Sequence, residues 1–156
     1  MRTLPLGTVT IVGLGLIGGS FALGLKAHRL CREVVGVSRS EATLAKGLEL
    51  GVIDRAEPDV EKAVRGADLV MLAAPIGTTE ALLRKMAPAL DGTTIVTDAG
   101  SVKGNVATAA KAVFGSVPPW FVPGHPIAGS ERSGVEAAKV DLYRNHKVIL
   151  TPDNAT

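Results

Sequence analysis

The chain has 156 residues, which is enough for one domain with a buried core. Apolar residues make up 46% of it, aromatic residues only 3%, and 18 residues are glycine, a composition typical of an α/β domain. The net charge of +2 comes without a cluster of Arg and Lys, so we expect no nucleic-acid partner. No apolar stretch is long enough for a membrane span and no signal peptide is visible, so we expect a cytoplasmic protein without a membrane partner. The single cysteine, Cys31, excludes an internal disulfide and offers no metal-binding cluster.

Strand-like segments alternate with segments of helical periodicity along the chain. Runs of β-branched and aliphatic residues predict strands, and apolar residues that recur every three or four positions predict helices. The predicted strands are 8–12, 33–37, 68–73, 93–97, 120–122 and 147–150. The predicted helices are 17–28, 41–50 with Ser40 as its N-cap, 59–64, a helix from Thr78 or Thr79 to about Pro88, and 102–114. The alternation predicts an α/β fold with a doubly wound, mostly parallel sheet, built as a single domain over residues 1–150.

A glycine-rich motif, Gly13-Leu14-Gly15-Leu16-Ile17-Gly18, joins the first predicted strand to the first predicted helix. This is the context that the dinucleotide fingerprint of a Rossmann fold requires. Gly13 would allow the tight turn, Gly15 would let the main chain approach a pyrophosphate, and Gly18 would let helix and strand pack closely. The N–H groups at the helix start, at Leu16 and Ile17, would hold the phosphates. The motif therefore predicts a dinucleotide site rather than a turn without a ligand.

The end of the second predicted strand bears on the choice between NAD and NADP. An NAD site usually carries an acidic residue about 20 positions beyond the glycines, where it binds the ribose 2′-hydroxyl. This chain has Ser38 and Arg39 there. A hydroxyl and a guanidinium suit a 2′-phosphate, so NADP is favoured over NAD. The alternative is an ordinary solvated Arg39 after a strand, with which Glu41 could pair.

The segment 124–131, Gly-His-Pro-Ile-Ala-Gly-Ser-Glu, is the most unusual in the chain. It follows a predicted strand, so we expect a loop at the carboxyl edge of the sheet, where ligands bind in open α/β folds. His125 is the side chain best suited to move a proton near neutral pH, and Pro126 favours an extended main chain at His125. The alternative is a loop histidine that bonds a nearby carbonyl.

Two other strand ends reach the same edge. Ser101, within 98–103, either caps the following helix or contacts the ligand, and both are compatible. Ala74 and Pro75 follow the third long strand, and their small size would let a dinucleotide lie against the main chain.

Residues 12–20, 98–103 and 124–131, taken in chain order, resemble the prephenate/arogenate dehydrogenase family of tyrosine biosynthesis. The resemblance implies an oxidative decarboxylation of prephenate or arogenate with hydride transfer to NAD(P). It also implies that His125 accepts the proton of the ring hydroxyl or a strong hydrogen bond from it, that Ser101 orients this hydroxyl, and that Glu131 helps to gate the pocket.

The family also has a helical C-terminal domain that forms a homodimer and supplies substrate-binding residues. Residues 151–156 are polar and are expected to begin the linker to that domain. We expect the 156 residues alone to bind the cofactor with little or no turnover. Two alternatives remain open: an NADP oxidoreductase of the β-hydroxyacid or imine-reductase type, and a non-catalytic NAD(P)-binding sensor.

Overall fold

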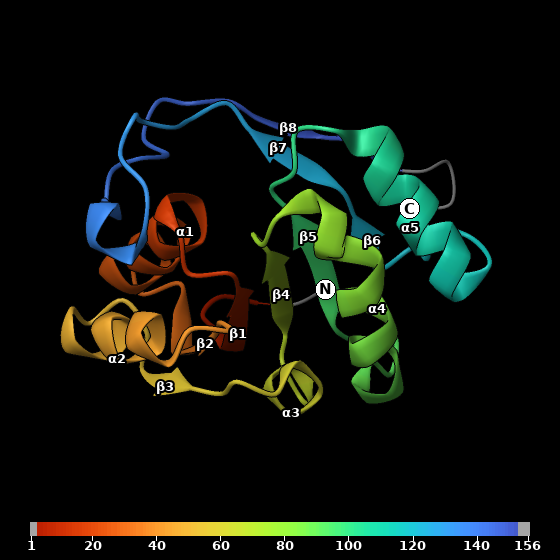
Figure 1. The fold of residues 1–156 in the computed structure, drawn as a ribbon, viewed down its shortest axis with the longest axis horizontal. Helices are drawn as coiled ribbons and strands as arrows, with labels where there is room; N and C mark the ends of the chain where they lie inside the picture. The colour runs from red at the N-terminus through yellow and green to blue at the C-terminus, as the bar shows by residue number, and fades with distance from the viewer. Residues whose placement is uncertain (1–2, 153–156) are drawn as a thin grey trace.

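A computed structural model describes residues 3–152 and shows one six-stranded parallel sheet with helices packed on both faces (Figure 1). The strand order is β3-β2-β1-β4-β5-β6, the order of a doubly wound Rossmann sheet, which confirms the predicted fold class. The strands of this sheet are β1 (Leu6–Val12), β2 (Cys31–Val37), β3 (Arg55–Ala56), β4 (Leu69–Leu72), β5 (Ile95–Asp98) and β6 (Phe121–Val122). The α-helices are α1 (Leu16–Ala27), α2 (Glu41–Glu49), α3 (Val60–Val64), α4 (Thr79–Met86) and α5 (Lys103–Phe114). The short 3-10 helices are η1 (Ile76–Thr78), η2 (Ala87–Ala89) and η3 (Val135–Ala137).

The core consists of two aliphatic clusters, one on each face of the sheet. Successive strand residues point to opposite faces, so Val34 joins the cluster under α1 and α2, while Val35 joins the cluster under α3, α4 and α5. Phe121 of β6 is fully buried in the second cluster. Burial on both faces explains why the central strands are aliphatic runs rather than alternating patterns.

Several predicted helix ends are confirmed. Ser40 caps α2 by accepting a hydrogen bond from the Thr43 N–H at 3.2 Å, and Gly51 follows the helix with a φ of 69°. Thr78 stands at the start of α4, but its hydroxyl donates to the Pro75 carbonyl at 2.6 Å instead of capping the helix.

The end of the chain departs from the prediction. The expected loop around His125 is a strand, β7 (Gly124–Pro126), and the expected last strand of the sheet, β8 (Val148–Leu150), is paired with it. The two form a separate antiparallel hairpin in which His125 lies opposite Ile149. The predicted linker begins at Thr151, whose N–H donates to the Pro123 carbonyl at 2.8 Å, and its remainder from 153 onward lies outside the described residues.

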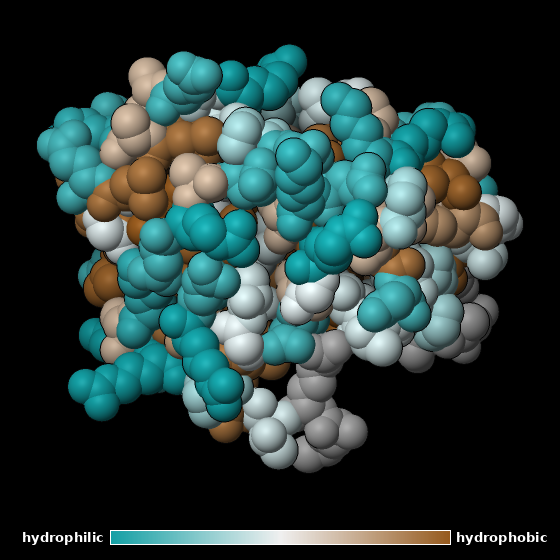
Figure 2. Space-filling view, turned by 90° about the horizontal axis from the view of Figure 1, so that it is seen from below, coloured by the Kyte–Doolittle hydropathy of each residue, from teal (hydrophilic) through white to brown (hydrophobic). Residues whose placement is uncertain are grey.

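That hairpin carries a run of three exposed hydrophobic side chains. The face below the sheet in Figure 1 is covered mainly by hydrophilic residues (Figure 2). In β8, by contrast, Val148, Ile149 and Leu150 are 52%, 49% and 58% exposed. Within residues 3–152, no helix is both long and apolar enough to cross a membrane.

Candidate dinucleotide and proton-transfer site

The glycine motif forms the tight turn between β1 and α1 at the centre of the sheet. Gly13 has a φ of 102°, which side chains rarely adopt, and a Cβ at this position would lie 2.6 Å from the main chain of Ala73. Both the main-chain conformation and the lack of space therefore require glycine here. A Cβ on Gly18 would lie 2.1 Å from the Gly13 carbonyl oxygen, so Gly18 lets α1 pack directly on the turn. These contacts are the ones that the motif predicted for the first and third glycines.

The second glycine faces open space. A Cβ on Gly15 would meet nothing within 4 Å, although Gly15 begins α1 as its N-cap. In the described part of the chain no side chain caps α1, and its first turn holds no acidic residue, so the N–H groups and the positive end of the helix dipole face this space. Leu16 and Ile17 supply N–H groups of that first turn. Open space in front of an uncapped helix start fits a pyrophosphate.

A cleft of about 910 Å³ extends from this turn across the carboxyl ends of β1, β2 and β4. Such a volume lies in the range of cofactor sites. The predicted residues that line it are Gly13, Gly15, Ser38, Arg39, Ala74 and Pro75. The structure thus brings the glycine turn and the end of β2 together in one cleft, as an extended dinucleotide requires.

The far end of the cleft carries hydroxyl and cationic groups. Ser38 accepts a hydrogen bond from the Ser40 N–H at 3.1 Å, which fixes the turn after β2. Arg39 is exposed and forms no ion pair with any residue of 3–152, so the alternative pairing with Glu41 is wrong. Lys85 of α4 lines the same cleft and has no ion-pair partner in the described part of the chain. Lys85 was missed because nothing in a local sequence pattern shows that α4 lines the cleft.

Acidic side chains of the cleft are already engaged. Asp59 accepts hydrogen bonds from the first N–H groups of α3, at Glu61 and Lys62. Glu61 forms an ion pair with Arg65 at 2.9 Å. The cations without partners therefore determine the charge offered to a ligand at this end.

Ser101 lies in the turn between β5 and α5, and its side chain is exposed. The N-cap of α5 is Val102, and no side chain caps the helix, so the interpretation of Ser101 as a capping residue is wrong. The main chain of the turn is fixed by Asp98, because the Gly100 N–H donates to Asp98 Oδ2 at 2.9 Å. The Ser101 hydroxyl is thus left available on a fixed turn.

His125 is half-buried in β7, and its extended main chain agrees with the effect expected of Pro126. Its Nδ1 is buried and has no hydrogen-bond partner among residues 3–152. The alternative of a histidine bonded to a nearby carbonyl is therefore not seen at Nδ1. An unpartnered buried ring nitrogen is unusual and calls for a ligand or a catalytic role.

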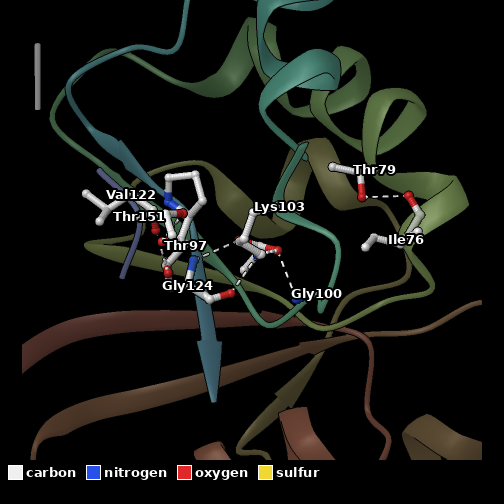
Figure 3. A network of polar contacts seen from close by, with 10 residues as sticks. Ile76, Thr79, Thr97, Gly100, Lys103, Val122, Gly124 and Thr151 are labelled. Atoms are coloured by element: carbon white, nitrogen blue, oxygen red, sulfur yellow. Dashed lines mark hydrogen bonds and ion pairs between the residues drawn. The ribbon is translucent and has the colours of Figure 1, made fainter. Parts of the chain in front are cut away.

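An ion pair between Asp98 and Lys103 joins the Ser101 turn to the His125 strand (Figure 3). Asp98 is 4% exposed at the end of β5, and its Oδ1 accepts the Gly124 N–H at 3.0 Å. Lys103 donates to Asp98 and also to the Gly124 carbonyl at 2.6 Å. Sequence reasoning quoted both charged residues within a motif but gave neither a role.

The connector between β7 and β8 packs on α1. A Cβ on Gly19 would lie 2.9 Å from the Ala138 Cβ, and the Lys139 N–H donates to the Ser20 hydroxyl at 2.9 Å. Glu131, expected to gate a pocket, is exposed in this connector and forms no ion pair within residues 3–152. The connector therefore ties the histidine hairpin to the helix that begins the nucleotide loop.

Strand order, glycine turn and cleft together define a Rossmann-type dinucleotide-binding domain. The family model described as the nucleotide-binding domain of prephenate dehydrogenase matches residues 21–156. The chain belongs to this family, as the resemblance in the sequence implied.

Relatives and solved structures agree. The chain is 39% identical to the prephenate dehydrogenase of Bacillus subtilis over 150 residues, which are 96% of this chain and 40% of that protein. The crystal structure of prephenate dehydrogenase from Aquifex aeolicus with hydroxyphenyl propionate and NAD+ superposes with a TM-score of 0.89 at 36% identity, over 99% of this chain and 54% of that one. Synechocystis arogenate dehydrogenase gives a TM-score of 0.84 at 35% identity, over 95% of this chain and 51% of that one. The chain thus spans about half the length of these relatives.

Proposed function

We propose that this chain is the cofactor-binding half of an enzyme that oxidatively decarboxylates prephenate or arogenate. The observation that carries the proposal is His125: its buried Nδ1 lacks a hydrogen-bond partner among residues 3–152, and its strand is tied to the Ser101 turn. Family membership supports the same reaction and disfavours an enzyme of the β-hydroxyacid or imine-reductase type. The relatives that suggest the substrates carry the names prephenate dehydrogenase and arogenate dehydrogenase.

His125 accepts the proton of the ring hydroxyl, or a strong hydrogen bond from it, as the substrate loses a hydride from the same carbon. The bound nicotinamide supplies the hydride acceptor. The ring carboxylate leaves as CO2, the electron pair of the broken bond enters the ring, and the oxygen recovers its proton as the ring becomes aromatic. Ser101 orients the hydroxyl toward His125.

The dinucleotide is held by the glycine turn and by the residues that line the cleft. Gly13, Gly15 and Gly18 shape the turn, Leu16 and Ile17 supply N–H groups to the pyrophosphate, and Ala74 and Pro75 lie along the chain of the cofactor. Ser38 and Arg39, with the additional cation Lys85, favour a 2′-phosphate and hence NADP over NAD. NAD+ in the A. aeolicus structure shows that a relative binds the cofactor without this phosphate.

The rest of the active site is proposed to come from a C-terminal helical domain that also forms a homodimer. The exposed apolar residues of β8 fit a surface that such a domain covers. Glu131, on the exposed connector, is proposed to contact the substrate pocket once that domain is in place. A cytoplasmic location is proposed in line with the biosynthetic role.

Reduction of NAD+ and NADP+ by the full-length protein, with prephenate and with arogenate, tests this proposal. Turnover is expected with one or both substrates and a lower KM for NADP+ than for NAD+. Tight cofactor binding without reduction under any combination would instead support the non-catalytic sensor. Little or no turnover is expected from residues 1–156 alone.

A further inference from the structure

The Asp98–Lys103 ion pair holds both main-chain groups of Gly124, the residue that precedes His125. The Gly124 N–H donates to Asp98, and the Gly124 carbonyl accepts from Lys103 (Figure 3). The peptide groups on both sides of Gly124 are therefore fixed. The Lys103 side chain is 19% exposed and the Asp98 side chain 4%, so water competes little for these bonds. The entry to β7 is therefore fixed by charge-assisted hydrogen bonds, which are the strong ones.

The residues just before Gly124 are held in the same way by the end of β5 and by the residue after β8. Thr97 donates its hydroxyl to the Val122 carbonyl at 2.8 Å, and Thr151 donates its N–H to the Pro123 carbonyl at 2.8 Å. A Cβ on Gly124 would lie 3.2 Å from the Asp98 carbonyl oxygen, which shows how closely β7 crosses β5. The main chain that leads into His125 therefore has little conformational freedom.

The same carboxylate also fixes the other candidate catalytic segment. Asp98 Oδ2 accepts the Gly100 N–H, and Gly100 directly precedes Ser101. One oxygen of Asp98 therefore holds the serine turn, and the other holds the histidine strand. Lys103 closes the arrangement, because it lies at the start of α5 and bonds both Asp98 and Gly124.

A buried ion pair is a poor source of stability, because desolvation offsets most of its attraction and apolar residues of similar size often replace it without loss. Its benefit is geometric. We propose that Asp98 and Lys103 are positioning residues that set the Ser101 hydroxyl and the His125 ring relative to each other. This inference rests on the proposed function, because it assigns the pair to the placement of that function's two catalytic groups.

The test compares Lys103→Met with the wild type in the full-length protein, using steady-state reduction of NAD(P)+. A displacement of about 1 Å between catalytic groups lowers rates about 100-fold, so kcat is expected to fall by about that factor. KM for the cofactor is expected to change less than about threefold, because Lys103 does not line the cleft. Lys103→Arg, which keeps a cation and several donors, is expected to recover most of the lost kcat.

Lys111→Met is the matched control, because it removes an exposed charge from the same helix. It is expected to leave kcat unchanged. Hydrogen exchange supplies a readout apart from turnover: Lys103→Met should speed exchange of the Gly124 N–H while the amides of β1 and β4 stay protected. If Lys103→Met does not fold, the double variant Asp98→Asn/Lys103→Met, which leaves no unpaired buried charge, replaces it with the same expected loss of kcat.

A folded Lys103→Met or double variant that retains wild-type kcat would overturn the inference. So would equal losses in Lys103→Met and Lys111→Met. If the wild type reduces neither cofactor with either substrate, the proposed function itself fails, and the Gly124 exchange rate still reports whether the ion pair fixes the strand.

Discussion

Gly15→Ala separates cofactor binding from folding, because the added methyl group would meet no protein atom. Nothing lies within 4 Å of a Cβ at this position. The φ of Gly15 is −92°, which alanine adopts without strain. Because alanine is a poorer N-cap than glycine, the free energy of unfolding is expected to fall by only about 0.5–1 kcal/mol.

The same methyl group would occupy the space in which the pyrophosphate approaches the start of α1. If it prevents one hydrogen bond from a main-chain N–H to a charged phosphate, the loss is about 1.5–3 kcal/mol. That loss corresponds to about a 10- to 150-fold increase in the Kd of NAD(P)+. The predicted variant is thus folded, slightly less stable than the wild type, and binds much more weakly.

Isothermal titration with both cofactors, together with denaturant unfolding, measures the two effects on the full-length protein. Gly24→Ala is the control in the same helix: its nearest contact would be the Val140 carbonyl oxygen at 3.7 Å. It is expected to add about 0.5–1 kcal/mol of stability and to leave binding unchanged. Gly18→Ala provides the opposite case, because its Cβ would lie 2.1 Å from the Gly13 carbonyl oxygen, and overpacking of this kind costs about 1–3 kcal/mol.

A folded Gly15→Ala variant that binds both cofactors as tightly as the wild type would refute the reasoning. The pyrophosphate would then lie elsewhere in the cleft. An equal loss of affinity in Gly24→Ala would also refute it, because the effect would not be specific to the turn.

Three further predictions concern the cofactor, the reaction and the stability of the fold. Arg39→Ala should weaken NADP+ binding about tenfold or more and NAD+ binding little, which titration with both measures; equal losses would show that Arg39 does not bind the 2′-phosphate. His125→Asn should lower kcat about 100-fold or more in the full-length enzyme with its folding unchanged, and full retention of kcat would remove His125 from the mechanism. Burial raises the pKa of Asp54, but the hydrogen bonds from Lys26 and a main-chain N–H outweigh it and hold the pKa below its usual range. The contribution of Asp54 to stability is therefore present above its unfolded-state pKa and lost as the pH falls through its folded-state pKa. Asp54→Asn should make the free energy of unfolding less dependent on pH between these two values. An unchanged slope of the free energy of unfolding against pH would contradict this.

The parts of the fold set by local pattern were predictable from the sequence. The glycine turn was recognised because its strand, its loop and its helix are neighbours in the chain. The strand β7 was not, since its partner β8 lies more than 20 residues away and no local pattern shows which segments will pair. The strand β3 was missed because it has only two residues, Arg55 and Ala56, which are too few to show the alternation of apolar and polar residues typical of a strand.

The candidate site divides in the same way. His125 and Ser101 were singled out by residue type and by their place after strands. That Asp98 and Lys103 join them follows only from tertiary structure, because a carboxylate at a strand end gives no sign of which amides will reach it. Lys85 likewise lines the cleft only through the packing of α4 between α3 and α5. Sequence reasoning found the groups suited to chemistry and missed those that place them.

The most direct test of the account is the amount of CO2 released and of NAD(P)H formed by the full-length protein with prephenate or arogenate. Equal amounts of the two products are expected from the wild type, and neither product is expected from His125→Asn. Formation of NAD(P)H without CO2, or of neither product with any substrate and cofactor, would contradict it.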